Sequence, residues 1–299
     1  MKAWIPVLSF MALVVMADGC RRDPILEMST NYYLKIDSDL EVLYRTVKPP
    51  KIMDAILYDL STGKIVTENY MDPEGGVLHG AMAGTYGLLV YNFGTSSTSV
   101  ENQDRNYTAN ATGSYISRDD LPTIYEPDHL FVARDTVTLP HISRDEEYVV
   151  ECSPKSICDV WVVIVEGVRK LENAEGIVFT MSGQSKGNIF FVEDPIQEEV
   201  AVRFNGMVSD DNTLIYGVFN TFGRLDDRRI PSIVSLTIGG PNGAVYSYSA
   251  DVTDQFFDPE NTKHIIRIRF DEEVRPRDDG GFDPRAEPWS TDETTVYVE

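Results

Sequence analysis

Histidine, cysteine and tryptophan are scarce in this 299-residue chain, which contains four, three and three of them. The histidines are scattered and lack the spacing of metal-binding or acid–base sites: they are His79, His129, His141 and His264. The sequence also lacks a Gly-x-Ser-x-Gly elbow, a His-Glu-x-x-His motif, a phosphate-binding loop and a dinucleotide fingerprint. We therefore expect a protein that is not an enzyme and that uses no cofactor and no metal.

Basic residues are also few: the chain has 26 Lys and Arg but 48 Asp and Glu, which gives a formal net charge of −22. Nucleic-acid binding depends on neutralising phosphates with Lys and Arg, so we expect no nucleic-acid partner. A body this acidic is repelled by anionic headgroups, and membrane contact then requires a separate anchor. Carboxylates are too abundant for any pair of them to indicate a glycosidase site.

The N-terminus carries a short apolar run within MKAWIPVLSFMALVVMADGCRRD. Ala3 to Met16 follow Lys2 and span 14 residues, fewer than the roughly 20 needed to cross a bilayer, as in the h-region of a secretory signal peptide. The ending Gly19-Cys20 resembles the lipobox of bacterial lipoproteins, in which a small residue precedes the lipidated Cys. That resemblance implies a signal peptide over 1–19 and lipid attachment at Cys20. The alternative is an ordinary signal peptide followed by a coincidental cysteine.

Two further cysteines, Cys152 and Cys158, lie in VECSPKSICDVW. A disulfide persists in an exported protein, but six residues of extended strand separate two Cα atoms by about 20 Å, too far for a disulfide. The pair can bond only if residues 153–156 make a tight reversal. A disulfide and two buried strand cysteines therefore both stay open. A zinc site is a poorer interpretation, because no histidine lies nearby and two cysteines do not complete a tetrahedron.

Most of the chain after residue 30 has the pattern of short strands, rich in Val, Ile, Tyr, Phe and Thr and often alternating with period two, as in SIVSLTIGG and HIIRIRFDEEV. Turn residues such as Ser61-Thr62-Gly63 separate them, and no 15-residue window shows a sustained helical stripe. Regular short strands between turns predict antiparallel β-sandwiches.

Length and a polar break predict the domain organisation. Removing residues 1–19 leaves 280 of the 299, enough for two domains of ordinary size. The polar stretch HISRDEE at 141–147 is the best boundary. We expect a lipidated linker over 20–30, an N-terminal β-sandwich over 31–143 and a C-terminal β-sandwich over 144–299.

Several polar segments and the three tryptophans carry smaller expectations. TSSTSVENQDRNYTANATGS (Thr95–Ser114) is expected to be a long exposed loop. Three acidic segments lack the spacing of an EF-hand and are expected to be solvated turns: Ser209–Thr213, Arg224–Arg229 and Arg277–Glu287. Trp4 falls in the signal peptide, Trp161 in an apolar strand that looks like core, and Trp289 in a segment expected to be exposed.

Five segments are similar to one group of proteins when taken together: GTYGLLVYNFGT, IYEPDHLFVAR, VVIVEGVRKLENAEGIVFTMSG, YSADVTDQF and GGFDPRAEPW. They resemble the fimbrillin-like lipoproteins of Bacteroidetes, in particular domain-of-unknown-function family 5119, which is allied to the fimbrial anchor proteins of type V pili. The resemblance implies an all-β fold of two consecutive transthyretin-like antiparallel β-sandwich domains on a lipid anchor, without catalytic residues. Arg21 and Arg22 follow Cys20, at positions where surface-displayed members of this group often carry acidic residues. The sequence therefore leaves open whether the protein faces outward or toward the periplasm.

Two functional hypotheses follow from these features. The first is an outer-membrane lipoprotein that anchors, assembles or joins a fimbria-like or adhesive structure and binds protein subunits by strand addition to an open sheet edge. The alternative is a surface glycan-binding lipoprotein of a nutrient-uptake system, which needs exposed aromatic side chains against which sugar rings can stack.

Overall fold

The computed structural model describes residues 31–37, 41–42, 45–46, 50–168, 171, 174–240 and 243–274. The signal peptide, Cys20, the 20–30 linker, Arg277–Glu287 and Trp289 lie outside these described residues. Within them the regular structure is β-strand, apart from one short helix, α2 (Thr253–Phe256). The all-β expectation is confirmed. No helix in this part of the chain is long and apolar enough to span a bilayer.

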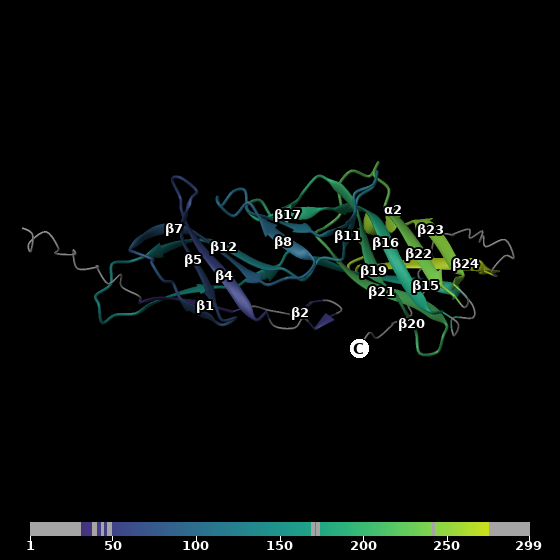
Figure 1. Ribbon diagram of the computed structural model, residues 1–299, viewed down its shortest axis with the longest axis horizontal. Coiled ribbons are helices and arrows are strands. Elements are labelled where there is room, and N and C mark those ends of the chain that lie inside the picture. The colour runs from purple at the N-terminus through teal and green to yellow at the C-terminus, as the bar shows by residue number, and fades with distance from the viewer. Residues whose placement is uncertain are drawn as a thin grey trace, which may run out of the picture.

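The N-terminal half is built on a five-stranded sheet in the order β14-β12-β7-β4-β5, and a three-stranded sheet, β13-β1-β6, packs on one of its faces (Figure 1). The five-stranded sheet consists of β14 (Lys155–Ser156), β12 (Phe131–Leu139), β7 (Gly84–Phe93), β4 (Ile52–Asp59) and β5 (Ile65–Met71). The three-stranded sheet consists of β13 (Tyr148–Cys152), β1 (Tyr32–Ile36) and β6 (Gly75–Val77). A two-stranded ribbon, β2 (Glu41–Val42) and β3 (Arg45–Thr46), lies in the connection from β1 to β4.

The five-stranded sheet is buried on both faces, which explains its continuous apolar runs. On β4, Ala55 and Leu57 pack toward the three-stranded sheet, whereas Ile56 and Tyr58 pack on the opposite face. That opposite face meets a four-stranded junction sheet, which supplies buried side chains such as Ala111. The junction sheet consists of β18 (Asp194–Pro195), β17 (Gly187–Ile189), β9 (Asn110–Gly113) and β8 (Thr98–Glu101).

The C-terminal half is a β-sandwich of a six-stranded and a four-stranded sheet with one apolar core between them. The six-stranded sheet consists of β10 (Tyr115–Ser117), β11 (Thr123–Tyr125), β19 (Glu199–Asn205), β16 (Gly176–Ser185), β22 (Ile233–Gly239) and β23 (Val245–Asp251). The four-stranded sheet consists of β20 (Met207–Val208), β21 (Leu214–Thr221), β15 (Asp159–Val168) and β24 (Ile265–Val274). Trp161 lies in this core, with its ring centroid 4.3 Å from Phe256 and 4.5 Å from His264. Its assignment to the core is confirmed.

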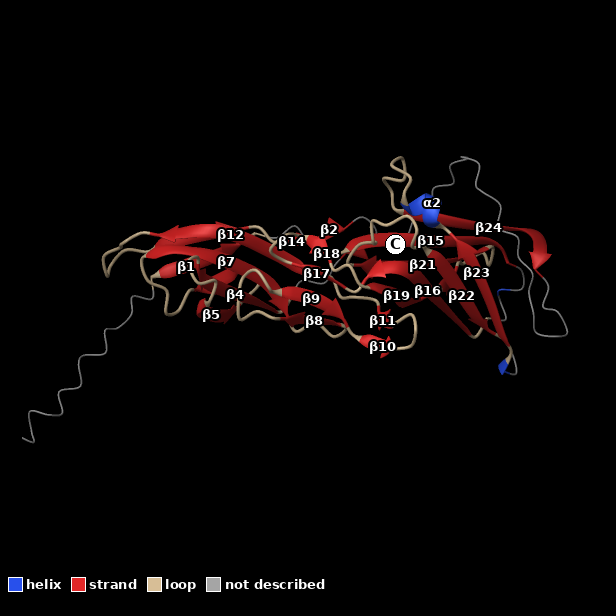
Figure 2. Ribbon diagram, turned by 90° about the horizontal axis from the view of Figure 1, so that it is seen from above, coloured by secondary structure: helices blue, strands red, loops and turns tan. Residues whose placement is uncertain are grey.

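The two halves lie end to end, with the junction sheet between them (Figures 1 and 2). The chain crosses between them several times. β10 and β11 join the six-stranded sheet, β13 and β14 return to the N-terminal sheets, and β17 and β18 join the junction sheet. A single cut between residues 143 and 144 therefore does not separate the sheets. How the chain divides into domains stays a prediction.

Crossing segments also introduce parallel pairs among the antiparallel ones. β1 pairs in parallel with β13, β11 with β19, and β15 with β24. Each pair joins strands far apart in sequence, as parallel pairing requires a long connection rather than a hairpin. The expectation of antiparallel sheets is thus correct for most pairings and wrong for these three.

The segment Thr95–Ser114 is not the long exposed loop expected from its polar composition. It forms β8 and β9, and Thr98, Ala109 and Ala111 are buried. Its small side chains are the reason, because they let the junction sheet lie close to the five-stranded sheet. The composition of the segment indicates polarity, but Ala109, directly before β9, and Ala111 within β9 both pack in the cluster beneath the five-stranded sheet.

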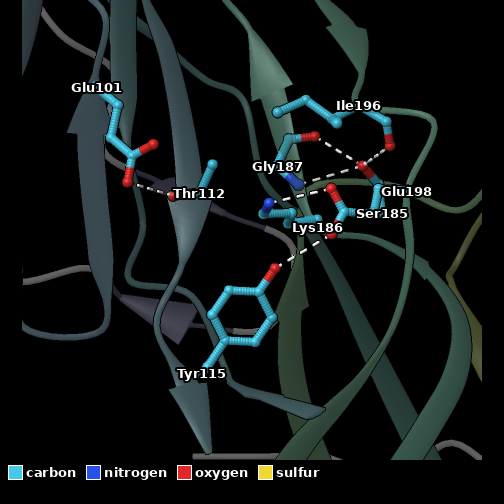
Figure 3. Close-up of polar contacts among 8 residues, drawn as sticks. All are labelled: Glu101, Thr112, Tyr115, Ser185, Lys186, Gly187, Ile196 and Glu198. Atoms are coloured by element: carbon cyan, nitrogen blue, oxygen red, sulfur yellow. Dashed lines mark hydrogen bonds and ion pairs between the residues drawn. The ribbon is translucent and has the colours of Figure 1, made fainter. Parts of the chain in front are cut away.

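Lys186 links the junction sheet to the six-stranded sheet through its backbone. Its carbonyl accepts from the N–H of Gly113 at 3.0 Å, and its own N–H donates to the carbonyl of Glu198 at 3.1 Å. Beside it, the hydroxyl of buried Ser185 lies 2.7 Å from the carbonyl oxygens of both Gly187 and Ile196 (Figure 3). The ladder of hydrogen bonds thus continues from one half of the molecule into the other.

Side chains reinforce the same crossing. The ammonium of Lys186 lies 3.0 Å from Glu198 Oε2, and the hydroxyl of Tyr115 donates to Glu198 Oε1 at 3.2 Å (Figure 3). Residue 187 must be a glycine because the backbones of β17 and β9 approach closely there. A Cβ at this position would lie 2.0 Å from the carbonyl oxygen of Ala111. The junction is therefore built as a fixed connection.

Candidate functional site: an open sheet edge

The residues considered for metal binding do not form a cluster. No three His, Cys, Asp or Glu side chains gather to hold a metal ion in the part of the chain that the structure describes. Asp211 accepts hydrogen bonds from Ser209 and Thr213, both at 2.7 Å, and Asp227 pairs with Arg229 at 2.6 Å. These carboxylates stabilise their own exposed turns.

Cys152 and Cys158 lie on opposite faces of the five-stranded sheet. Cys152 packs in the core beneath the three-stranded sheet, and Cys158 packs in the cluster beneath the junction sheet. Both are buried free thiols, and burial raises the pKa of each to about 12. The sequence left two possibilities open, a disulfide and two buried strand cysteines. In this structure the two cysteines are buried and are not bonded to each other.

The strands that end each sheet are the candidate binding elements, because an edge strand presents unpaired backbone groups. The four-stranded sheet ends in β24, whose first residues are covered by side-chain amides. The Asn261 amide exchanges two hydrogen bonds with the backbone of Ile265, at 2.9 and 3.0 Å. The Gln255 amide does the same with Arg267, at 2.8 Å in both directions. The start of this edge is therefore closed to another strand.

β5, the last strand of the five-stranded sheet, is seven residues long and has a more open edge. It pairs with β4 on one side, and no described strand pairs with its other side. His79 contacts it through side chains: its carbonyl accepts from the Thr67 hydroxyl at 2.6 Å, and its N–H donates to Asn69 Oδ1 at 2.9 Å. Lys64, directly before β5, forms an isolated antiparallel bridge with Arg105, and the side chains of Ile65 and Val66 that follow it are exposed.

An exposed aromatic patch lies beside this edge, made of Ile52 on β4, Tyr70 on β5 and Phe93 on β7. These side chains are 43%, 57% and 48% exposed. Ile52 is the cross-strand partner of Phe93, and the rings of Tyr70 and Phe93 meet edge to face at a centroid distance of 5.0 Å. The patch thus spans three strands, and Tyr70 and Phe93 combine large apolar area with few rotatable bonds.

A buried carboxylate, Asp54, lies between the patch and the core. It is the cross-strand partner of both Tyr70 and Tyr91, and its Oδ2 accepts from the Tyr91 hydroxyl at 2.5 Å. Among the described residues its Oδ1 has no hydrogen-bond partner. Burial raises the pKa of Asp54 to about 6 despite the hydrogen bond from Tyr91, which lowers it.

Neighbouring groups hold the same row of side chains in place. The Tyr70 hydroxyl donates to Glu68 at 2.7 Å, and the Tyr91 hydroxyl accepts from the Gln103 amide at 2.8 Å. The bond to Glu68, together with burial, raises the pKa of Tyr70 to about 12. Tyr70 is therefore a neutral hydrogen-bonded phenol throughout the physiological range.

Sequence reasoning predicted open edges as a class but missed β5 and the patch. The sequence IVTENYM does place exposed Glu68 and Tyr70 alternately with buried Asn69 and Met71. That alternation signals a strand with one exposed face, but which strand ends a sheet depends on long-range pairing. Phe93 and Ile52 look like core residues in their apolar runs, and only the limited reach of the neighbouring sheet leaves them exposed.

Comparisons with known proteins bear on the fold. No family model and no curated protein matches the sequence. A candidate adhesin from Bacteroides ovatus is similar over 90% of this chain and 99% of its own, with 17% identity and a TM-score of 0.62. A second candidate adhesin from that species covers 84% of this chain and 90% of its own, with 13% identity and a TM-score of 0.51. The fimbrial anchor protein Mfa2 from Porphyromonas gingivalis covers 80% and 89%, with 12% identity and a TM-score of 0.50. The chain therefore shares the β-sandwich fold of these adhesin-type structures.

Proposed function

We propose that this protein is a non-enzymatic, lipid-anchored component of an adhesive or fimbria-like structure of the bacterial outer membrane. The single observation that carries the proposal is the open edge of β5 beside an exposed aromatic patch. The fold shared with adhesins and with a fimbrial anchor supports it. The resemblance of the sequence to family 5119 points the same way.

Strand addition is the binding mode that this edge fits. A partner segment lying along β5 would extend the five-stranded sheet by backbone hydrogen bonds, and its alternate side chains would pack on one face of that sheet. On the face of Tyr70 and Phe93 those side chains would cover the patch. Because β5 carries a single charged residue, Glu68, apolar contact and backbone pairing should dominate, and binding should resist salt.

The lipid anchor would hold the N-terminal half nearest to the membrane. The proposed anchor Cys20 is eleven residues before Asn31, the first described residue, a distance of at most about 40 Å when extended. β1 follows at once and lies in the N-terminal half, away from the C-terminal sandwich (Figure 1). β5 belongs to this same half, so the proposed partner would join close to the anchor.

The test is capture of partners by the soluble body, residues 21–299, from outer-membrane extracts at high salt. We expect recovery of a specific fimbrial or surface subunit, lost with Val66→Lys at the open edge and with Tyr70→Ala in the patch. Ser247→Lys on exposed β23 is the matched control and should leave capture intact. Capture unaffected by both β5 variants would reject the edge, and turnover of any glycan or peptide would reject a non-enzymatic role.

A second candidate function, glycan binding, is favoured by the same aromatic patch. The exposed rings of Tyr70 and Phe93 with the carboxylate of Glu68 offer a stacking surface next to hydrogen-bond acceptors. A polysaccharide panel distinguishes the two functions. Glycan binding that Tyr70→Ala removes and Val66→Lys leaves intact, without protein capture, would favour the glycan-binding role over strand addition.

A further inference from the structure

The two aromatic rings of the patch beside β5 meet above the strand that separates them. Tyr70 lies on β5 and Phe93 on β7, and both strands pair with β4, so their backbones are about 10 Å apart. The ring centroids are nevertheless only 5.0 Å apart. The rings therefore lean toward each other across β4, next to their cross-strand partners Ile52 and Asp54. We call Tyr70 and Phe93 the ring pair.

The ring pair lies over a carboxylate with an unused oxygen. Asp54 is fully buried, and its Oδ2 accepts from the Tyr91 hydroxyl, whereas its Oδ1 has no hydrogen-bond partner among the described residues. Tyr91 is itself fixed, because its hydroxyl accepts from the Gln103 amide and its ring packs against Phe190 at a centroid distance of 6.1 Å. A buried carboxylate with an unbonded oxygen is costly, and a positive charge close to it would offset that cost.

A second carboxylate, Glu68, lies at the exposed margin of the ring pair. It is two residues from Tyr70 on β5, and its Oε1 accepts from the Tyr70 hydroxyl at 2.7 Å. Neither Asp54 nor Glu68 forms an ion pair in the part of the chain that the structure describes. Lys64 and Arg105 bridge at the start of β5, where the Arg105 guanidinium donates to a carbonyl of the β4–β5 turn at 3.0 Å. The ring pair thus combines two exposed ring surfaces with two carboxylates that lack a cation.

We propose that the ring pair binds an arginine side chain carried by the partner strand. The inference rests on the proposed strand addition at β5 and names the side chain that selects the partner. The faces of Tyr and Phe rings attract a guanidinium, and the planar guanidinium matches a carboxylate such as Glu68 through two parallel hydrogen bonds. A strand paired with β5 places its side chains about 5 Å from those of Glu68 and Tyr70 on the same face. An arginine there would reach both residues, and its charge would act on Asp54 below.

Charge complementarity favours this occupant over the other side chains that a strand could present. An acidic side chain would face two carboxylates that have no cation, and an apolar one would cover the rings but leave those carboxylates uncompensated. Lysine supplies the charge without the stacking plane or the two parallel donors, so it should bind more weakly than arginine. Backbone pairing along β5 is the same for any sequence, and the ring pair would let this edge distinguish among partner strands.

The experiment measures binding of the body 21–299 to an array of blocked seven-residue peptides. Each peptide alternates threonine and valine and differs only at its centre, which is arginine, lysine, citrulline, leucine or glutamate. We expect the arginine peptide to bind about tenfold more tightly than the citrulline peptide, which has the same shape without the charge, and the lysine peptide to lie between them. Val66→Lys at the open edge should weaken all the peptides, because it hinders strand pairing.

Charge reversal at Glu68 is the decisive variant. Glu68→Lys should invert the preference, so that the glutamate peptide binds more tightly than the arginine peptide. Asp54→Asn should reduce the preference for arginine over citrulline about threefold and leave binding of the citrulline peptide unchanged. Glu175→Lys, at an exposed position in the C-terminal half, changes the net charge by the same amount as Glu68→Lys. It is the matched control and should keep the preference for arginine.

The outcomes separate failure of the arginine site from failure of strand addition. Peptides that bind equally well whatever their centre, and that Val66→Lys weakens, would overturn the arginine site and leave strand addition in place. A preference that follows Glu68 but withstands Val66→Lys would support the arginine site and reject pairing at this edge. Equal loss of the preference in Glu175→Lys and Glu68→Lys would assign it to the acidic body as a whole and overturn the proposal. If no peptide binds, both the arginine site and strand addition at β5 are rejected.

Discussion

The side-chain amide of Gln255 faces the backbone of Arg267 and bonds it twice, donating through Nε2 to its carbonyl and accepting its N–H at Oε1, each at 2.8 Å. Asn261 repeats this arrangement with Ile265. Two amides thus replace the neighbouring strand that β24 lacks at its start. Natural sheets cover their edges by such devices to avoid pairing with other chains.

We predict that Gln255→Ala with Asn261→Ala opens this edge. Four hydrogen bonds to the β24 backbone are lost, together with a fifth from Asn261 to the carbonyl of Gln255. Each backbone group left without a partner costs about 1–3 kcal/mol if it stays away from water. We expect a lower midpoint of denaturant unfolding and concentration-dependent self-association in analytical ultracentrifugation. Gln197→Ala, which removes an exposed amide from the surface, is the control and should change neither. A monomeric double variant of unchanged stability would contradict the covering role.

The junction between the two halves should depend on Gly187. Its substitution by Ala would place a Cβ 2.0 Å from the carbonyl oxygen of Ala111 and force β17 away from β9. We expect a loss of about 2–4 kcal/mol in unfolding free energy and faster proteolysis around residues 187–199. Gly176→Ala is the matched control, because nothing lies within 4 Å of the added methyl group there. Equal protease resistance of the two variants would argue against a fixed junction.

Limited proteolysis also tests how the chain divides. Cleavage in the polar stretch 141–147 is expected, because every residue there except Ile142 is exposed. The two fragments should nevertheless co-elute on size exclusion, since β13 and β14 remain paired with β1 and β12. Fragments that separate without denaturant would instead support independent domains divided at residues 143 and 144.

Local patterns in the sequence predicted the strands well but not their partners. SIVSLTIGG alternates as β22 does in the six-stranded sheet, with Val234, Leu236 and Ile238 buried, and the apolar run around Trp161 is core. Period and composition are local properties, whereas pairing depends on contacts between distant segments. The crossing of residues 115–125 and 187–195 between sheets therefore left no signal in the sequence.

The sequence predicts that the binding site is the edge of a sheet, but it does not predict which strand forms that edge. An all-β chain must have edge strands, but Gln255 and Asn261 cover one of them and the reach of the junction sheet exposes Phe93 beside another. Amide side chains in a polar segment look like ordinary solvated residues until their backbone partners are known. The sequence therefore pointed to strand addition without indicating β5.

The lipid anchor stays a prediction from the N-terminal sequence. Cys20→Ala should release the protein from the membrane fraction, because no acyl chain can then be attached and an acidic body has little affinity for anionic headgroups. Immunoblots of membrane and soluble fractions give the measurement, with Cys152→Ala as a control that leaves the lipobox intact. Unchanged membrane fractionation of Cys20→Ala would reject lipidation at this residue.

The buried carboxylate of Asp54 should make stability depend on pH in an unusual direction. Its pKa is raised from 3.8 to about 6 in the folded chain, so between these values the folded state binds more protons than the unfolded state. Unfolding free energy should therefore fall as pH rises from about 4 to about 6, by roughly 2 kcal/mol, and then stay level with respect to this group. Below pH 4 the carboxyl is protonated in both states and contributes no slope.

Asp54→Asn keeps an oxygen that accepts the Tyr91 hydroxyl and cannot ionise, so it should remove this slope and be more stable than wild type at pH 7. Asp59→Asn is the informative control. Its turn hydrogen bonds lower the Asp59 pKa to about 2, so its contribution is present above pH 4 and lost as pH falls through 2. Urea unfolding at several pH values between 3 and 8 separates the two. If Asp54→Asn keeps the wild-type slope between pH 4 and 6, the Asp54 carboxylate ionises without penalty, and its burial against Tyr91 does not control its charge.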